Sequence, residues 1–274
     1  MILKHTENFW TILAVNKLCN LEKIVMRKTL YITGGNGLIG NAVCKKFMSE
    51  GYYCVSLDKL SGDNGDTKGQ NFHHLFFDLS ETASLREKIK SFFHGKMPKP
   101  NVWVNCGYPR TEKFALSREG SLDHSDWRAN VNLQLNNTCL ICSEVAREMS
   151  LTGGGSIVNV ASIYGMRAPR FAVYEGTELG MPPAYSVIKA GVINYSRQLA
   201  AVYADRGVRI NTISPGGVLN QQDNVFLSNY SDQVPIGRLA SPEEIAAPIF
   251  FLSSEDASYI TGANIPVDGG WTAT

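Results

Sequence analysis

The 274-residue chain lacks a surplus of charge of either sign. Its 26 lysines and arginines balance 25 aspartates and glutamates, for a formal net charge of +1. A protein without a basic surplus has no general electrostatic attraction to nucleic acid or to an anionic membrane. We therefore expect neither of these as a partner.

Long hydrophobic runs are missing as well. The apolar run from Phe9 to Val15 covers seven residues, which is far too short to span a bilayer. Charged residues precede it and no small-residue cleavage site follows it, so a signal peptide is not expected. The sequence therefore predicts a cytoplasmic protein.

The six cysteines do not follow a metal-binding pattern. Only Cys139 and Cys142 form a Cys-x-x-Cys pair, with no second pair and no cluster of histidines. They fall within an apolar helical run rather than at a helix N-terminus, where the dipole would lower the pKa of a thiol. We interpret the pair as core thiols in a reducing compartment and expect no metal site.

From residue 28 onward, short β-rich runs alternate with helical runs. Strands are expected over 29–33, 53–57, 75–77, 101–105, 156–162, 208–213 and 265–267, and helices over 38–49, 83–93, 127–149, 184–203 and 242–252. This alternation predicts an α/β fold with a single Rossmann-type domain, in which a doubly wound parallel sheet is flanked by helices. We assign residues 26–274 to this single domain. Residues 1–25 carry no motif and are expected to be an extension that is disordered or not native.

A glycine-rich turn joins the first predicted strand to the first helix. Within Thr33-Gly34-Gly35-Asn36-Gly37-Leu38-Ile39-Gly40, the glycines at 35, 37 and 40 have dinucleotide-binding spacing. Glycines let the backbone approach a pyrophosphate, and the helix N-terminus supplies N–H groups and a positive dipole end. A plain glycine-rich turn is the alternative, but the flanking strand and helix favour a cofactor site. Its expected contacts are Gly34, Asn36, Gly37, Leu38, Ile39 and Gly40.

Asp58 makes NAD the predicted cofactor. This residue closes the second strand, 18 positions after Gly40. A carboxylate at that place accepts hydrogen bonds from the adenosine ribose hydroxyls and repels a 2′-phosphate. Lys59 beside it could pair with a 2′-phosphate, so NADP is the less favoured alternative. Asp58 could also be an ordinary turn aspartate.

The clearest catalytic signal is Tyr185, because it alone among the eleven tyrosines has a lysine, Lys189, four positions later. A phenol with a pKa near 10 is a poor base at neutral pH. An ammonium group one helical turn away would stabilise the phenolate and lower that pKa. Such a pair suits proton transfer between an alcohol and a ketone. Surface residues can share this spacing, but the glycine turn upstream argues for catalysis.

Together these motifs resemble the short-chain dehydrogenase/reductase family, in its compact single-domain branch, from about Thr29 to Trp271. The same family order continues through Asp78-Leu79, Asn105-Cys106-Gly107, Ser162, Pro215-Gly216 and Val267-Asp268-Gly269-Gly270. The resemblance implies an NAD(P)-dependent oxidoreductase acting on CH–OH groups. Further cofactor contacts that it implies are Asp78 and Leu79 at the adenine, Asn105, Cys106 and Gly107 beside the fourth strand, Tyr185 and Lys189, and Pro215, Gly216 and Val218 over the nicotinamide.

The resemblance also implies four catalytic residues. Tyr185 would exchange a proton with the substrate oxygen, and Ser162 would hydrogen-bond the same oxygen. Lys189 would bond the nicotinamide ribose and lower the tyrosine pKa. Asn132 would position a water behind Lys189, although its neighbour Asn130 is an alternative for that place.

Three departures from the family pattern stand out. Leu38 replaces a usual glycine, as in the larger sugar-nucleotide epimerases and dehydratases, but the chain has no room for their substrate domain after Gly270. Ser162 and Tyr185 are 23 positions apart, more than usual, and we expect the extra stretch 167–181 to form a lobe over the substrate. Asn220 replaces a threonine, which could alter one cofactor contact.

The segment 104–110 and the long insertion look like the oxidoreductases of bacterial flagellin and surface-glycan modification. That resemblance implies a small-molecule substrate, a sugar or activated sugar, and a role in carbohydrate biosynthesis. Expected substrate contacts are Tyr108, Arg110, Tyr164, Arg167 and Gly217, although Tyr108 and Arg110 could be ordinary surface groups. An epimerase or dehydratase with tightly bound NAD and a non-catalytic nucleotide sensor remain as alternatives.

The predicted helix 184–203 carries an apolar stripe at helical spacing. Its members are Ile188, Val192, Tyr195 and Leu199. Such a stripe faces either the core or another subunit. The family usually pairs this helix between subunits, so the resemblance implies a homodimer or a homotetramer.

Overall fold

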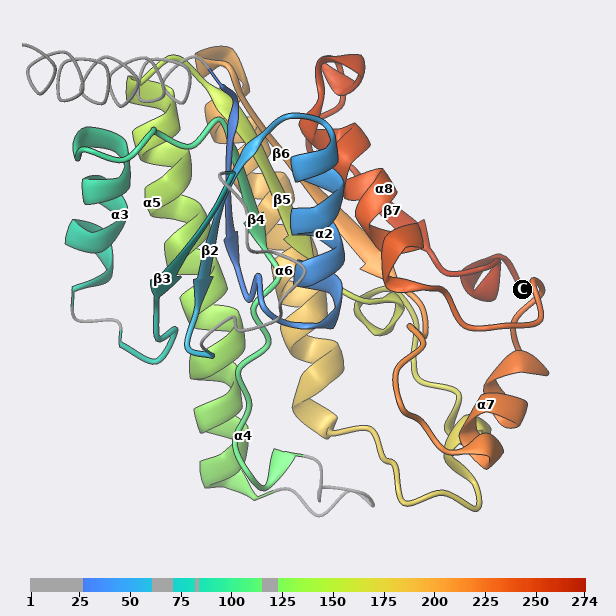
Figure 1. Ribbon diagram of the computed structural model, residues 1–274. Coiled ribbons are helices and arrows are strands. Elements are labelled where there is room, and N and C mark those ends of the chain that lie inside the picture. The colour runs from blue at the N-terminus through green and yellow to red at the C-terminus, as the bar shows by residue number, and fades with distance from the viewer. Residues whose placement is uncertain (1–26, 61–70, 82–83, 115–122) are drawn as a thin grey trace, which may run out of the picture.

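A single parallel sheet forms the centre of the structure, a computed structural model that describes residues 27–60, 71–81, 84–114 and 123–274. Its strands are β1 Thr29–Thr33, β2 Tyr53–Asp58, β3 Phe72–Phe76, β4 Val102–Asn105, β5 Gly155–Val160, β6 Val208–Pro215 and β7 Asn264–Val267. They lie in the order β3-β2-β1-β4-β5-β6-β7 (Figure 1). The chain winds outward from β1 to one edge and from β4 to the other, which confirms the doubly wound α/β fold.

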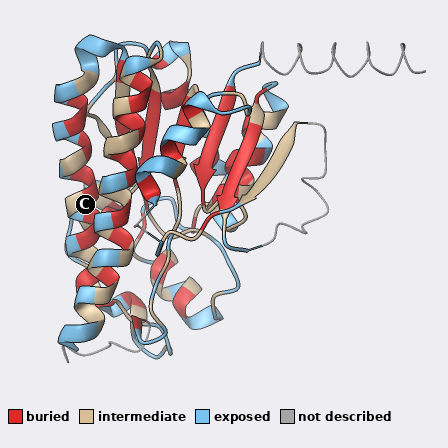
Figure 2. Cartoon of the chain, turned by 90° about the vertical axis from the view of Figure 1, so that its left-hand side faces the viewer, coloured by how far each residue is buried: buried red, intermediate tan, exposed pale blue. Residues whose placement is uncertain are grey.

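Helices cover both faces of the sheet. The α-helices are α2 Leu38–Ser49, α3 Leu85–His94, α4 His124–Asn130, α5 Asn137–Leu151, α6 Pro183–Tyr203, α7 Asn224–Ser231 and α8 Pro242–Ser253. On one face α2 packs against α8, and on the other α5 packs between α3 and α6 (Figure 1). Consecutive residues of β1 accordingly enter different cores: Leu30 and Ile32 join α2 and α8, whereas Tyr31 joins α3 and α5. Figure 2 shows the buried strands between helices whose outer faces are exposed.

The predicted helix 127–149 is divided in the structure. Asp123 caps α4 by accepting hydrogen bonds from the N–H groups of Ser125 and Asp126. A π-helical turn, Val131–Asn136, then separates α4 from α5. Such turns are rare and often lie at functional sites.

Most of the apolar stripe of α6 belongs to the core of this chain. Ile188, Val192 and Leu199 are buried, and Tyr195 is partly buried against the same core. The predicted extension, residues 1–25, lies outside the described residues. Within the described part of the chain, no helix is both long and apolar enough to cross a membrane.

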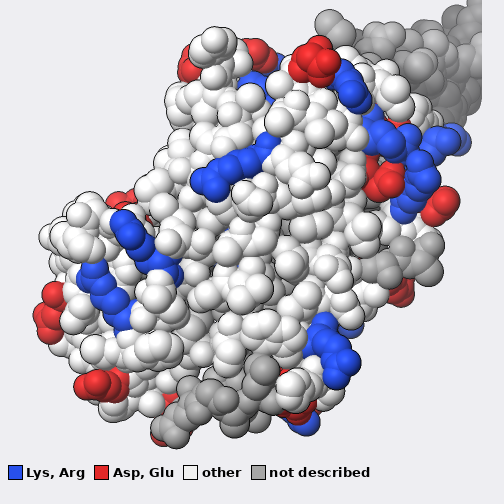
Figure 3. All heavy atoms as spheres, turned by 180° about the vertical axis from the view of Figure 1, so that it is seen from behind, with Lys and Arg blue, Asp and Glu red and all other residues white. Residues whose placement is uncertain are grey.

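The face seen in Figure 3 carries acidic and basic side chains intermixed, without an extended patch of one sign. This distribution agrees with the near-zero net charge. It offers no field on that face that would attract a polyanion.

Candidate active site

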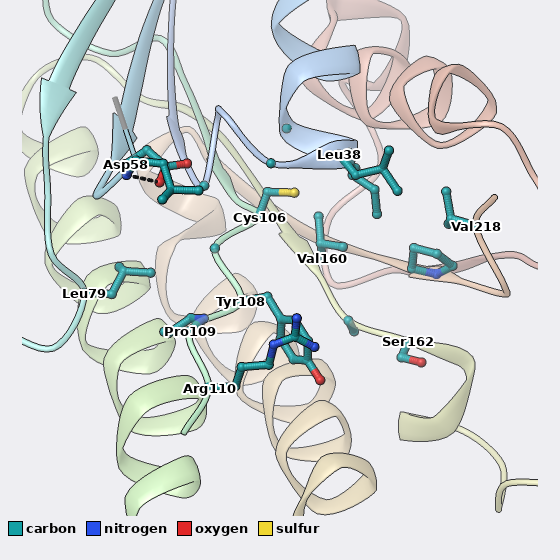
Figure 4. Close-up of a pocket in the computed structure, with 18 of the residues that line it drawn as sticks. Leu38, Asp58, Leu79, Cys106, Tyr108, Pro109, Arg110, Val160, Ser162 and Val218 are labelled. Carbon is teal, nitrogen blue, oxygen red and sulfur yellow. Dashed lines mark hydrogen bonds between the residues drawn. The ribbon is translucent and has the colours of Figure 1, made fainter. Parts of the chain in front are cut away.

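Two adjoining cavities lie where β1, β4 and β5 end. The larger, of about 690 Å³, runs from the glycine turn to Tyr185 (Figure 4). The smaller, of about 300 Å³, continues beneath the 167–181 insertion. Ser162 and Tyr185 line both cavities, as do Tyr108, Arg110 and Gly216. Because the strand order reverses between β1 and β4, this is the expected ligand crevice of an open α/β sheet.

The glycine turn has no room for side chains at its key positions. A Cβ atom on Gly40 would overlap the carbonyl oxygen of Gly34, and one on Gly35 would lie 2.5 Å from the Ser56 hydroxyl. Gly34 itself has a φ of 69°, which favours glycine. No side chain caps α2 at Gly37, so the N–H groups of the first helical turn are open to a ligand. The turn therefore fits a pyrophosphate.

At the far end of the larger cavity, Asp58 fixes two loops. Its carboxylate accepts hydrogen bonds from the N–H groups of Asn36 and Leu60, each at 3.0 Å. Lys59 pairs with Asp78 at 3.0 Å. Hydrogen bonds from Ser80 and this lysine lower the pKa of Asp78 to about 2. The ammonium group of Lys59 is thus held by a carboxylate.

A buried polar chain fixes the cavity floor. Trp103 donates to Asn105 at 2.8 Å, and Asn105 donates to Asn159 at 2.7 Å. Asn159 in turn donates to Ser196 of α6 at 2.8 Å. This chain joins β4, β5 and α6 beneath the cofactor contacts expected at 105–107. Asn159 and Ser196 belong to no motif considered in the sequence, so they were not predicted.

Ser162, Tyr185 and Lys189 all line the larger cavity. Ser162 follows β5 and is buried, and its hydroxyl accepts from the N–H of Tyr164 at 3.2 Å. Tyr185 and Lys189 both belong to α6, which begins at Pro183, and their spacing of four positions places them one turn apart on one face of the helix. The Lys189 ammonium donates to the Val160 carbonyl at 3.0 Å and lies 5.6 Å from the centre of the Tyr185 ring.

The expected lowering of the Tyr185 pKa is not found. Burial raises the pKa of Tyr185, and the Ser162 hydroxyl offsets this only in part. Burial also lowers the pKa of Lys189 to about 8. The charged forms of both side chains lose hydration in this site, and that loss is the largest cause of each pKa shift.

The structure does not place Asn132 in the site. Its side chain is exposed, accepts a hydrogen bond from Asn136 at 2.6 Å and lines neither cavity. Asn130 is buried but is hydrogen-bonded to Thr111 and to the Asp126 carbonyl. The prediction assumed a continuous α-helix, and the π-helical turn changes which residues face inward.

Gln134 is a buried polar residue of that turn whose side chain has an unused hydrogen-bond acceptor. Its Nε2 donates to Asn130 at 3.4 Å. Its Oε1 is the single buried side-chain N or O atom without a hydrogen-bond partner in the described part of the chain. Such an atom is costly and calls for an explanation. The next residue, Leu135, packs beside Gly191 of α6, which places the turn near Lys189.

Seven aromatic rings line the smaller cavity. They belong to Tyr108, Phe114, Tyr164, Tyr174, Tyr185, Phe226 and Tyr230, and the charged residues in the lining are Arg110 and Glu178. The insertion 167–181 supplies Tyr174 and the run from Glu178 to Met181. Phe226 and Tyr230 come from α7, which was not predicted.

Four of the five expected substrate residues line the smaller cavity: Tyr108, Arg110, Tyr164 and Gly217. The fifth, Arg167, is exposed and lines neither cavity. The expected cofactor contacts that line the larger cavity are Gly34, Gly37, Leu38, Ile39, Gly40, Asp58, Lys59, Asp78, Leu79, Cys106, Gly107, Tyr185, Lys189, Pro215, Gly216 and Val218. Asn36 and Asn105 instead support the lining through their hydrogen bonds.

Comparison with known proteins identifies many similar chains. A family model described as enoyl-(acyl carrier protein) reductase matches residues 39–272. The chain is 29% identical over 253 residues to post-translational flagellin modification protein A of Campylobacter coli, covering 89% of this chain and 98% of that one. It is 31% identical over 258 residues to meso-2,3-butanediol dehydrogenase of Serratia marcescens, covering 90% and 95%. A Leptospira borgpetersenii short chain dehydrogenase solved with bound NAD+ superposes with a TM-score of 0.78 at 30% identity, covering 90% and 93%.

Proposed function

Because the chain belongs to the short-chain dehydrogenase/reductase family and is thus an NAD(P)-dependent oxidoreductase of alcohols and ketones, we propose that its substrate is a sugar derivative. The catalytic assignment rests on one observation. Ser162 and Tyr185 line both cavities where these adjoin, with Lys189 beside them. A substrate oxygen at that junction would meet both hydroxyl groups.

The reaction that follows is reversible hydride transfer at a secondary alcohol carbon. When bound, the nicotinamide supplies or accepts the hydride. Tyr185 donates its proton to the ketone oxygen in reduction and takes it back in oxidation. Ser162 donates a hydrogen bond to the same oxygen. Lys189, held by the Val160 carbonyl, places an ammonium group one helical turn from the phenol.

NAD is the cofactor that we propose. The open N-terminus of α2 and the glycine turn would hold the pyrophosphate. Asp58 stands at the end of β2, where it would meet the adenosine ribose and repel a 2′-phosphate. Lys59, which would favour NADP, is instead paired with Asp78.

A small polyhydroxylated substrate suits the smaller cavity. Its volume is about 300 Å³, and its lining includes aromatic rings, several of which carry hydroxyl groups. Such rings offer apolar faces to the C–H groups of a sugar, while the phenols bond its hydroxyls. The similarity to a flagellin modification protein supports a role in glycan biosynthesis. Tyr108, Arg110, Tyr164 and Gly217 would contact this substrate.

We also propose a homodimer or homotetramer that forms through α5 and α6. These helices expose Leu140, Leu151, Val187 and Val202. Exposed apolar side chains on neighbouring helices favour association. Light scattering after gel filtration would measure the oligomer, and a monomer would contradict this assignment.

The function is tested by NADH absorbance with a panel of sugars and alditols. A dehydrogenase makes or consumes NADH in proportion to substrate, an epimerase shows no net change, and a sensor only binds the cofactor. Tyr185→Phe should lower the turnover rate by about 10²–10⁴-fold, the usual contribution of a general acid–base group. NADH binding should survive, because the ring remains. A turnover rate within a few-fold of the wild type would contradict the assigned role.

A further inference from the structure

Arg110 is a cation without a polar partner at the junction of the two cavities. It lines both of them. Of the three cationic side chains in these linings, Lys59 has the Asp78 carboxylate and Lys189 has the Val160 carbonyl. Among the described residues, Arg110 forms no hydrogen bond and no ion pair, and its one contact of these kinds is with an aromatic ring.

That ring belongs to Tyr108, which presents the guanidinium to the cavity. The Arg110 Cζ lies 5.6 Å from the ring centre, and Figure 4 shows the guanidinium beside the ring. Tyr108 is itself held edge-on between Phe114, at 6.0 Å, and the catalytic Tyr185, at 5.7 Å. An arginine stacked on an aromatic face keeps its planar set of N–H donors free for a carboxylate.

The rest of the smaller cavity offers no second cation for such a group. Arg110 and Glu178 are the charged residues of its lining, whose other members are aromatic, aliphatic or small, and Glu178 already has an interaction partner. A carboxylate that left water for this aromatic cavity would need a charged donor to replace its hydration. Arg110 is the cationic side chain in that lining, one aromatic ring away from Tyr185.

We propose that Arg110 binds a carboxylate of the substrate, so that the preferred substrates are small hydroxy or oxo acids of the sugar type. This inference rests on the proposed dehydrogenase function and deepens it. It separates aldonic and uronic acids, which carry the carboxylate, from alditols and aldoses of the same size, which do not.

The test compares matched acids and neutral sugars in the wild type and in Arg110→Ala. The wild type should have a higher kcat/KM for the acids. Arg110→Ala should lower kcat/KM for the acids by roughly 100-fold, mainly through KM, because a charged hydrogen-bonding partner is lost. For neutral sugars, kcat/KM should fall clearly less than for the acids, because these sugars carry no charge for the guanidinium to bind. The NADH dissociation constant should not rise. Arg110→Lys keeps the charge without the two-pronged geometry and should retain part of the acid preference.

Lys113→Ala is the matched control. This substitution also removes one positive charge from the same segment. Lys113, however, pairs with Asp123 at 3.3 Å and lines neither cavity. Its removal should leave the acid preference intact. An equal loss in both variants would show a general effect of charge and would overturn the proposal.

Three further results would overturn it: preferred turnover of neutral sugars, an equal loss for acids and neutral sugars in Arg110→Ala, or weaker NADH binding in that variant, which would assign Arg110 to the cofactor. Tyr185-dependent turnover of neutral sugars alone would leave the dehydrogenase function standing. Absence of turnover with every alcohol would instead contradict that function. In that case, tryptophan fluorescence would measure how tightly the acids bind to the NADH complex of the wild type and of Arg110→Ala. Equal binding to both proteins would overturn the proposal.

Discussion

Replacing Arg170 by alanine should loosen the substrate lobe without disturbing the cofactor turn. Arg170 lies in the 167–181 insertion and donates to the carbonyl oxygens of Gln233, at 3.1 Å, Trp271, at 3.3 Å, and Thr274, at 2.8 Å. Its Cζ also lies 4.7 Å from the centre of the Trp271 ring. The insertion is thus tied to a segment about a hundred residues further along the chain.

From Trp271 the contacts lead back to the smaller cavity. Trp271 stacks on Tyr230 with the ring centres 4.7 Å apart, and the Tyr230 hydroxyl accepts a hydrogen bond from the N–H of Gly217. Tyr230 also packs on Phe226, which packs on Tyr174 of the insertion at 5.8 Å. Arg170 therefore closes a ring of contacts around the aromatic wall.

The size of the effect follows from the contacts that are lost. Hydrogen bonds from a charged group contribute about 1.5–3 kcal/mol and a cation–π contact about 0.5–2 kcal/mol, and such values do not simply add. For a half-buried arginine we expect a total near 3 kcal/mol, or a drop in Tm of roughly 6–12 °C at this chain length. The KM of the proposed sugar substrate should rise about 10-fold or more, as for a loss of about 1.4 kcal/mol of binding free energy. The NADH dissociation constant should stay within about two-fold, since Arg170 does not line the larger cavity.

Steady-state kinetics, NADH titration and thermal unfolding would measure these effects together. Arg170→Lys keeps the charge over Trp271 but cannot reach three carbonyl groups, so it should give an intermediate KM. Arg206→Ala is a matched control, because this arginine also stacks on an aromatic ring, Tyr203, at 5.1 Å, but away from the cavities. A lower Tm with an unchanged KM would refute the coupling between this clamp and the substrate lobe.

Three other predictions address the cofactor and the proton path. Wild-type protein should bind NADH more tightly than NADPH, and Asp58→Ala should reduce this difference in affinity. Tighter binding of NADPH than of NADH to the wild type, measured by titration, would refute the prediction. Because burial lowers the pKa of Lys189 to about 8, ketone reduction should slow as the pH rises through about 8, and Lys189→Arg should abolish that decline. Gln134 lines neither cavity, so Gln134→Leu should change kcat little. Its Tm should not fall, since an unpartnered buried oxygen is removed.

Much of the fold was predictable because its signals are local. The helix over Leu38–Ser49 has the predicted bounds, since glycines stand directly before it and shortly after it. The strand predicted at 75–77 lies instead at Phe72–Phe76. This is the edge strand β3, and its half-exposed positions include His73 and His74, which obscured the apolar pattern.

The elements that were not predicted depend on tertiary contacts. The helix α7 is eight residues long, Asn224–Ser231, and lies outside the strand–helix alternation. Its start is marked only by Asp223, which accepts a hydrogen bond from the N–H of Phe226. The π-helical turn has no periodicity of its own, so Asn132 was assigned to a face that it does not occupy. Motifs predicted which residue types the site holds, but not their orientation across an irregular turn.

Arg167 and Arg170 show the same limit within the insertion. Both are arginines in one short stretch of the chain, and Arg167 was expected to contact the substrate. In the structure Arg167 faces solvent, and Arg170 donates to carbonyl groups that lie 63 to 104 positions away. Only the folded arrangement distinguishes them. Arg110, by contrast, lines the smaller cavity, where it would meet the anionic group of the proposed substrate.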